Sequence, residues 1–153
     1  MIPVRRFTIA LVSLLLLFGG RSARAQFTIL TVGAPPAAMN ITTGTPGSSV
    51  YTVVATSTYF VKAKNPAGSQ KIIAQLDAPM PPNTSLTLEL GIPPSAITMG
   101  AVALDVTPQD LMVSVDKENG HTYSLTYTFI ANIAAGIIPS QSRVVTLTMM
   151  DYP

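Results

Sequence analysis

The 153-residue chain contains no cysteine, no tryptophan and a single histidine, His121. Without cysteine, the chain cannot form a disulfide framework, a thiolate zinc site or a thiol nucleophile. One histidine cannot build a multi-histidine metal centre, and its position after Asn119-Gly120 predicts an exposed side chain at a turn. The sequence therefore predicts no metal site and no cofactor.

Charged residues make up only 10% of the chain, and the cations are concentrated at its start. The formal charge of +2 includes Arg5, Arg6, Arg21 and Arg24, which all lie in the first 25 residues. The remaining residues carry five cations against seven carboxylates and form no clustered basic run. Because a nucleic-acid-binding protein needs a clustered basic face, we predict no nucleic-acid partner.

The first 25 residues have the three-part pattern of a secretory signal peptide. Two arginines precede an apolar run over residues 7–18, and Ala23 and Ala25 are the small residues that a signal peptidase reads. As a helix this run would rise about 18 Å, which is too short to cross about 30 Å of hydrocarbon. We expect cleavage between Ala25 and Gln26. The mature chain, residues 26–153, would then be secreted to the periplasm or cell surface without a transmembrane segment.

Turn-forming residues divide the mature chain into short segments rich in Thr, Val, Ile, Leu and Tyr. Short strands at this spacing are typical of a β-sandwich or barrel. Alternation is clearest over residues 122–129, where Leu125 belongs to the apolar face and Thr126 to the polar face. We therefore predict an all-β, Ig-like antiparallel sandwich of about seven to nine short strands. The predicted strands are Phe27–Val32, 50–56, 58–64, Gln70–Leu76, Thr84–Leu90, 97–104, 111–115, 122–129 and 143–150.

Several local features refine this prediction. Asn119-Gly120 favours a tight turn, which predicts a β-hairpin over Val113–Leu125, within the predicted strands 111–115 and 122–129. In the first of these strands, Met112 is expected on the polar face. Gly100 suggests a bulge within 97–104. Helix is limited to short turns at 108–111 and 131–138. The tyrosines expected to pack in the core or across strands are Tyr51, Tyr59, Tyr123 and Tyr127.

No set of residues predicts catalysis. The candidate acid–base carboxylates lie in or beside predicted loops, where surface positions explain them better. They are Asp105, Asp110, Asp116 and Glu118. The chain lacks the G-x-S-x-G nucleophile motif and a phosphate-binding loop, and residues 116–120 depart from calcium-loop spacing. We predict a protein that is not an enzyme.

The first and last predicted strands carry apolar residues on both faces and little charge. No charged residue lies between Arg143 and Asp151, although sheet proteins ordinarily protect their edges with charge. Two interpretations remain open. Either both strands are central and fully buried, or one of them completes a neighbouring subunit by strand addition. The candidate assembly residues are Val145, Leu147, Met149 and Tyr152.

The cleaved leader, the Thr- and Val-rich strands and the terminal segment RVVTLTMMDYP resemble secreted bacterial pilin-type and spore-coat-U-like subunits. The penultimate Tyr152 is similar to the C-terminal habit of many pilins. The resemblance implies an Ig-like structural subunit that assembles by strand exchange, with further copies or related β-sandwich subunits as partners. The alternative is a monomeric secreted binding module for a glycan, a peptide or a small ligand.

Overall fold

The computed structural model describes residues 27–42, 47–64 and 68–153. The predicted signal peptide and its cleavage site at Ala23, Ala25 and Gln26 lie outside these residues. Within them, the chain forms strands and one short 3-10 turn, and no helix is long and apolar enough to cross a membrane. The all-β prediction is confirmed.

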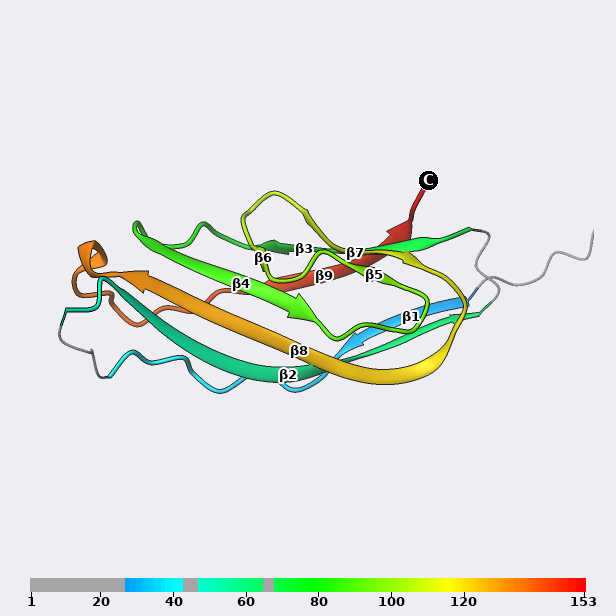
Figure 1. Cartoon of the computed structure of the whole chain (residues 1–153), viewed down its shortest axis with the longest axis horizontal. Helices are drawn as coiled ribbons and strands as arrows, with labels where there is room; N and C mark the ends of the chain where they lie inside the picture. The colour runs from blue at the N-terminus through cyan, green and yellow to red at the C-terminus, as the bar shows by residue number, and fades with distance from the viewer. Residues whose placement is uncertain (1–26, 43–46, 65–67) are drawn as a thin grey trace, which may run out of the picture.

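The strands form two antiparallel sheets that face each other (Figure 1). The elements are β1 (Phe27–Val32), β2 (Val50–Lys64), β3 (Gln70–Leu76), β4 (Thr84–Leu90), β5 (Ile97–Thr98), β6 (Val102–Ala103), β7 (Gln109–Val115), β8 (Glu118–Asn132), the turn η1 (Ile133–Ala135) and β9 (Val145–Asp151). One sheet has the order β1-β2-β8-β4-β6, and the other has the order β5-β7-β3-β9.

The core lies between the sheets and follows from the alternation of the strands. Leu125 in β8 and Leu88 in β4 are both 0% exposed, and they face the same core. Thr126 lies on the outer face, as the pattern predicts. Burying one such leucine contributes about 1.5–3 kcal/mol to folding, so alternation on the central strands supplies much of the stability.

Two long strands, β2 and β8, form the centre of the five-stranded sheet. We predicted two strands, 50–56 and 58–64, but β2 is continuous through Ser57, which pairs with Leu125. No turn residue interrupts the sequence there, and pairing with β8 holds the backbone extended on both sides of this position.

The predicted hairpin is wrong. β7 and β8 belong to different sheets, and the chain crosses between them at residues 116 and 117. Asn119 and Gly120 instead lie within β8, where the register with β2 shifts between Val61 and Ala63. The positive φ of Gly120 (100°) therefore serves a β-bulge, and a Cβ there would lie 2.9 Å from the Phe60 ring. An Asn-Gly pair can adopt the backbone angles of a tight hairpin turn or those of a β-bulge.

Three further local predictions need correction. Met112 is fully buried instead of facing solvent, because β7 is irregular: its register with β3 shifts and Ser114 has a positive φ of 54°.

The predicted helical turn at 108–111 is wrong, since β7 already begins at Gln109. The predicted strand 97–104 is divided at Gly100 (φ 72°) into β5 and β6, which join different sheets. The short turn expected within 131–138 is present as η1.

Candidate assembly edge

β9 is the outermost strand of the four-stranded sheet, and among the described strands it pairs with β3 alone (Figure 1). From Val145 to Met149, apolar and polar residues alternate strictly, so every second side chain turns toward the core. Val145, Leu147 and Met149 pack against that core but remain half-buried, whereas Thr146 and Thr148 are exposed. Three of the four predicted assembly residues therefore lie together on the inner face of an edge strand.

Two hydrogen bonds that flank the β3–β9 ladder show which backbone groups are free. The Asp77 N–H donates to the Val144 carbonyl (3.1 Å), and the Tyr152 N–H donates to the Ser69 carbonyl (2.8 Å). Bonding in an antiparallel pair alternates from one residue to the next, so the even-numbered residues of β9 bond to β3. The N–H and C=O groups of its odd-numbered residues point away from β3, toward a side where no described strand pairs with them.

Both terminal strands lie at sheet edges, so the interpretation that they are central and fully buried is wrong. β1 borders the five-stranded sheet, and β2 is its single partner within the part of the chain that the structure describes. Neither β1 nor β9 contains a fully buried residue. The low charge of these strands therefore does not reflect an interior position.

β1 and β9 border the same long side of the sandwich, where they contact each other. We refer to this side, bounded by Phe27–Val32 and Val145–Asp151, as the β1–β9 side. Leu30 packs against the core there, while Phe27 is 48% exposed. Each sheet thus ends on this side in a long strand with one unpaired edge.

Tyr152, the fourth predicted assembly residue, does not belong to the free edge, because its N–H donates to the carbonyl of Ser69, the residue before β3. The neighbouring Asp151 accepts a 2.5 Å hydrogen bond from the side-chain amide of Gln70. Gln70 is only 3% exposed, and no sequence motif marks this buried polar residue. These two bonds fasten the end of β9 to β3 and hold its free edge in place.

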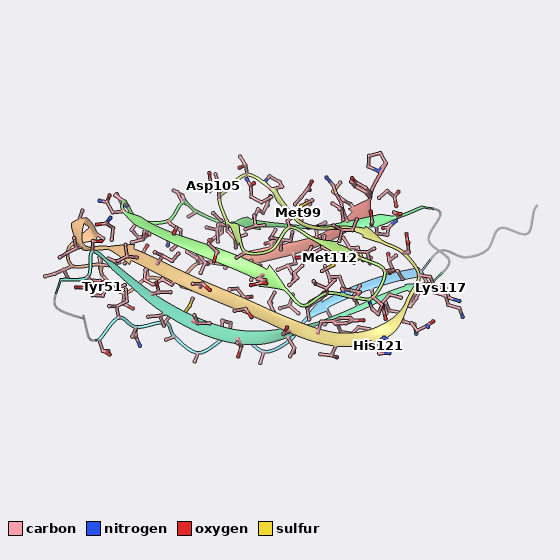
Figure 2. The ribbon with its side chains drawn as sticks, viewed as in Figure 1. Tyr51, Met99, Asp105, Met112, Lys117 and His121 are labelled. Atoms are coloured by element: carbon pink, nitrogen blue, oxygen red, sulfur yellow. The ribbon has the colours of Figure 1, made fainter. Side chains whose placement is uncertain are left out.

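His121 and Glu118 form the closest ionisable pair at the end of the sandwich where Figure 2 labels His121 and Lys117. The His121 Nδ1 lies 2.5 Å from a Glu118 carboxylate oxygen. The His121 side chain is 64% exposed, as predicted, but Glu118 is 5% exposed, so its predicted surface position is wrong. No group of three or more His, Asp or Glu residues that could hold a metal ion occurs among the described residues.

Three of the four tyrosines predicted to pack do so, namely Tyr59, Tyr123 and Tyr127, whereas Tyr51 is half-buried and is not part of the core. Tyr59 is fully buried, its ring centroid lies 5.7 Å from that of Tyr123 on β8, and its hydroxyl donates to the Gly91 carbonyl (2.5 Å). Burial, and to a lesser degree the neighbouring Tyr123 and Glu118, raises the pKa of Tyr59 well above its usual range. Burial also raises the pKa of Tyr127. Tyr59 thus contributes packing and a hydrogen bond to the fold, and Tyr127 contributes packing.

Comparison of the chain with protein-family models, curated proteins and solved structures gave no match.

Proposed function

We propose that this protein is an exported, non-enzymatic structural subunit that associates through β-strand addition at the free edge of β9. The single observation that carries the proposal is the state of that edge. It combines unpaired backbone groups, half-buried apolar side chains and no charge between Arg143 and Asp151. An edge strand of this kind is a template for another strand.

Strand addition would act on each of these features. A new strand beside β9 would pair the outward N–H and C=O groups of Val145, Leu147 and Met149, at about 0.5–1.5 kcal/mol net for each hydrogen bond. It would also cover the exposed parts of the same three side chains. Backbone pairing would supply affinity, and the alternating side chains would supply specificity.

The sequence supports an exported setting for this assembly. The first 25 residues have the charge, apolar run and small residues of a cleaved leader. The terminal segment and the strand-rich chain resemble bacterial pilin-type and spore-coat-U-like subunits, which assemble by exchanging strands. Intact mass of protein recovered outside the cytoplasm should show a chain that begins at Gln26. Retention of residues 1–25 would contradict export by cleavage.

Lysine substitutions on β9 test the assembly. Val145→Lys and Leu147→Lys should abolish self-association measured by light scattering, because each places a charge where an added strand must pack. The β-sheet circular dichroism signal should persist, since a lysine at a half-buried edge position can extend its amine to water. Thr126→Lys, on the outer face of the other sheet, is the matched control and should assemble normally. A wild-type protein that stays monomeric at millimolar concentration would contradict the proposal and favour a monomeric binding module.

A further inference from the structure

The segment that contains β9 is nearly symmetric about Leu147. Moving outward from Leu147, each position holds the same kind of residue on both sides, and the two ends carry opposite charges. The pairs are Thr146 with Thr148, Val145 with Met149, Val144 with Met150, and Arg143 with Asp151. A strand with this pattern is complementary to an antiparallel copy of itself.

From this symmetry, we infer that β9 pairs with β9 of a second copy, antiparallel and around a twofold axis at Leu147. The inference rests on the proposed function and names the strand that occupies the edge. In this register, Leu147 lies opposite Leu147 of the second copy, and Val145 lies opposite the second copy's Met149. The contact uses the same patch on both subunits, so it closes as a dimer.

The free backbone groups fit this register. The odd-numbered residues of β9 direct their N–H and C=O groups away from β3, and the twofold axis passes beside an odd-numbered residue. Opposite residues that are both odd-numbered exchange two hydrogen bonds in an antiparallel pair. The N–H and the C=O of Val145, Leu147 and Met149 would then all be paired. The strands β3 and β9 of one copy and β9 and β3 of the second copy would form one continuous sheet.

The charges at the two ends also fit. Arg143 donates hydrogen bonds to the backbone carbonyls of Pro79 (2.9 and 3.0 Å) and Ser142 (2.8 Å), and neither Arg143 nor Asp151 forms an ion pair with a described residue. In the dimer each Arg143 would lie opposite Asp151 of the other copy. Directly opposite residues have Cβ atoms about 4.5–5.5 Å apart, within reach of an ion pair at both ends of the interface.

Two exposed apolar residues on the outer face of this segment gain partners in the same register. Val144 is 58% exposed and Met150 is 44% exposed. Each would lie opposite the other across the interface, next to the paired threonines. Both faces of β9 would then bury apolar surface at the contact, which accounts for apolar residues on its outer as well as its inner face.

Charge reversal tests this register. We would produce the full sequence in an exporting host and measure the dimer dissociation constant of the purified protein by analytical ultracentrifugation. Arg143→Asp and Asp151→Arg should each raise that constant about tenfold or more, because like charges then face each other at both ends. The double variant should recover most of the lost affinity, because opposite charges face each other again, although the Gln70–Asp151 hydrogen bond stays broken. Mixing the two single variants should give heterodimers, since every opposed pair is then of opposite sign.

A cysteine substitution gives a second, independent readout, because the chain contains no cysteine. Leu147→Cys should form a disulfide dimer under mild oxidation, since Cα atoms of a hydrogen-bonded pair are about 5.5 Å apart, within disulfide range. Thr126→Cys on the other sheet is the control and should run as a monomer on the same non-reducing gel.

Arg143→Gln removes the charge without reversing it, so it should weaken the dimer less than Arg143→Asp.

The outcomes separate this inference from the proposed function. Restoration by the double charge reversal, together with cross-linking of the Leu147→Cys variant, supports the β9–β9 dimer. If Leu147→Lys blocks assembly but the double charge variant binds no better than the two single charge variants, the twofold register is overturned. Strand addition by another segment then remains as the explanation for assembly. A wild-type protein that remains monomeric at all concentrations overturns both.

Discussion

The two long sides of the sandwich end their sheets in different ways. On the β1–β9 side, the outermost strands are six and seven residues long. On the opposite side, the outermost strands β5 and β6 are two residues each, and one crossing segment between β4 and β7 supplies both of them. We refer to this as the β5–β6 side. A two-residue edge strand offers few backbone groups to another chain.

Hydrogen bonds fix the crossing segment to both sheets. The Met99 N–H donates to the Leu111 carbonyl on β7 (3.0 Å), and the Leu104 N–H donates to the Leu86 carbonyl on β4 (2.9 Å). Gly100, between them, permits the change of sheet with its positive φ of 72°. The chain thus shortens its own edges on the β5–β6 side, whereas on the β1–β9 side no described strand pairs with the outer edges of β1 and β9.

This difference shows that the edges of one sheet can be protected on one side of the sandwich and not on the other. Apart from Asp151 at the end of β9, the edge strands of both sides carry no charge, but only the β5–β6 side has a backbone device that shortens its edges. Among the described residues the β1–β9 side has no such device, and this is the reason to propose it as the interface. The following predictions test that contrast, from the largest expected effect to the smallest.

Lysine substitution should separate the two sides most strongly. Leu88 on β4, which pairs with β6, is fully buried, so Leu88→Lys places an unpaired charge in the core and should unfold the protein. Leu147→Lys on the β1–β9 side should leave the fold intact and remove only assembly. Circular dichroism and light scattering on the same samples measure both effects. If both variants unfold, the β9 edge is part of the core rather than a free surface.

Alanine truncation gives a graded version of the same contrast. Leu125→Ala should cost about 2–5 kcal/mol of unfolding free energy, because Leu125 is fully buried in β8 and truncation leaves a cavity. Leu147→Ala should cost about 1 kcal/mol, because its side chain is only half-buried in the monomer. Urea denaturation at low protein concentration measures the difference.

Thr126→Ala is the control for Leu125→Ala, one residue along the same strand and on the outer face. It should change the unfolding free energy by no more than about 0.5 kcal/mol. Equal denaturation midpoints for Leu125→Ala and Thr126→Ala would show that the two faces of β8 have been assigned wrongly.

The sequence predicts much of the fold because period-two alternation is strong wherever one face is buried. The boundaries of β1, β3 and β4 agree with the predicted ranges, and Leu125 is buried as expected. The failures occur where tertiary contacts override local signals. Asn119-Gly120 carries a turn signal, yet pairing of β8 with β2 converts it into a bulge. Met112 is buried because β7 is irregular, which no periodicity can reveal.

The candidate edge is less predictable than the fold. Residues 144–150 are uncharged and mostly apolar, which fits a buried central strand as well as an edge strand that lacks charge protection. Strand order decides between them, and strand order depends on contacts that are distant in sequence. Tyr152 illustrates the same limit, because its position in the chain does not reveal that its N–H faces β3.

High pH should weaken the β5–β6 side through Tyr59. Its hydroxyl donates to Gly91, the residue at which the crossing segment leaves β4. Because burial raises the pKa of Tyr59 above its ordinary value of about 10, the unfolded chain loses this proton first. The contribution to stability is therefore present below about pH 10 and is lost as the pH rises further.

Urea midpoints measured at pH 8 and pH 11 test this expectation. Tyr59→Phe should lower stability at pH 8, because it removes the hydrogen bond to Gly91, and it should lose less additional stability between the two pH values than the wild type. An identical pH dependence in wild type and variant would assign the alkaline effect to other groups, among them Tyr127, whose pKa is also raised.

The smallest expected effect concerns the turn that shortens the edges. Gly100 has a positive φ of 72°, and a Cβ added there would meet nothing within 4 Å. Gly100→Ala should therefore cost about 1 kcal/mol from backbone strain alone, without a clash. Gly68 is the control, because a Cβ there also meets nothing within 4 Å and its φ is not in the positive range. Gly68→Ala should cost nothing or stabilise slightly, since alanine restricts the unfolded chain. Both variants should assemble as the wild type does, because neither residue belongs to β1 or β9. Equal stabilities for the two variants would show that the crossing turn tolerates alanine and that the short edges do not depend on glycine at this position.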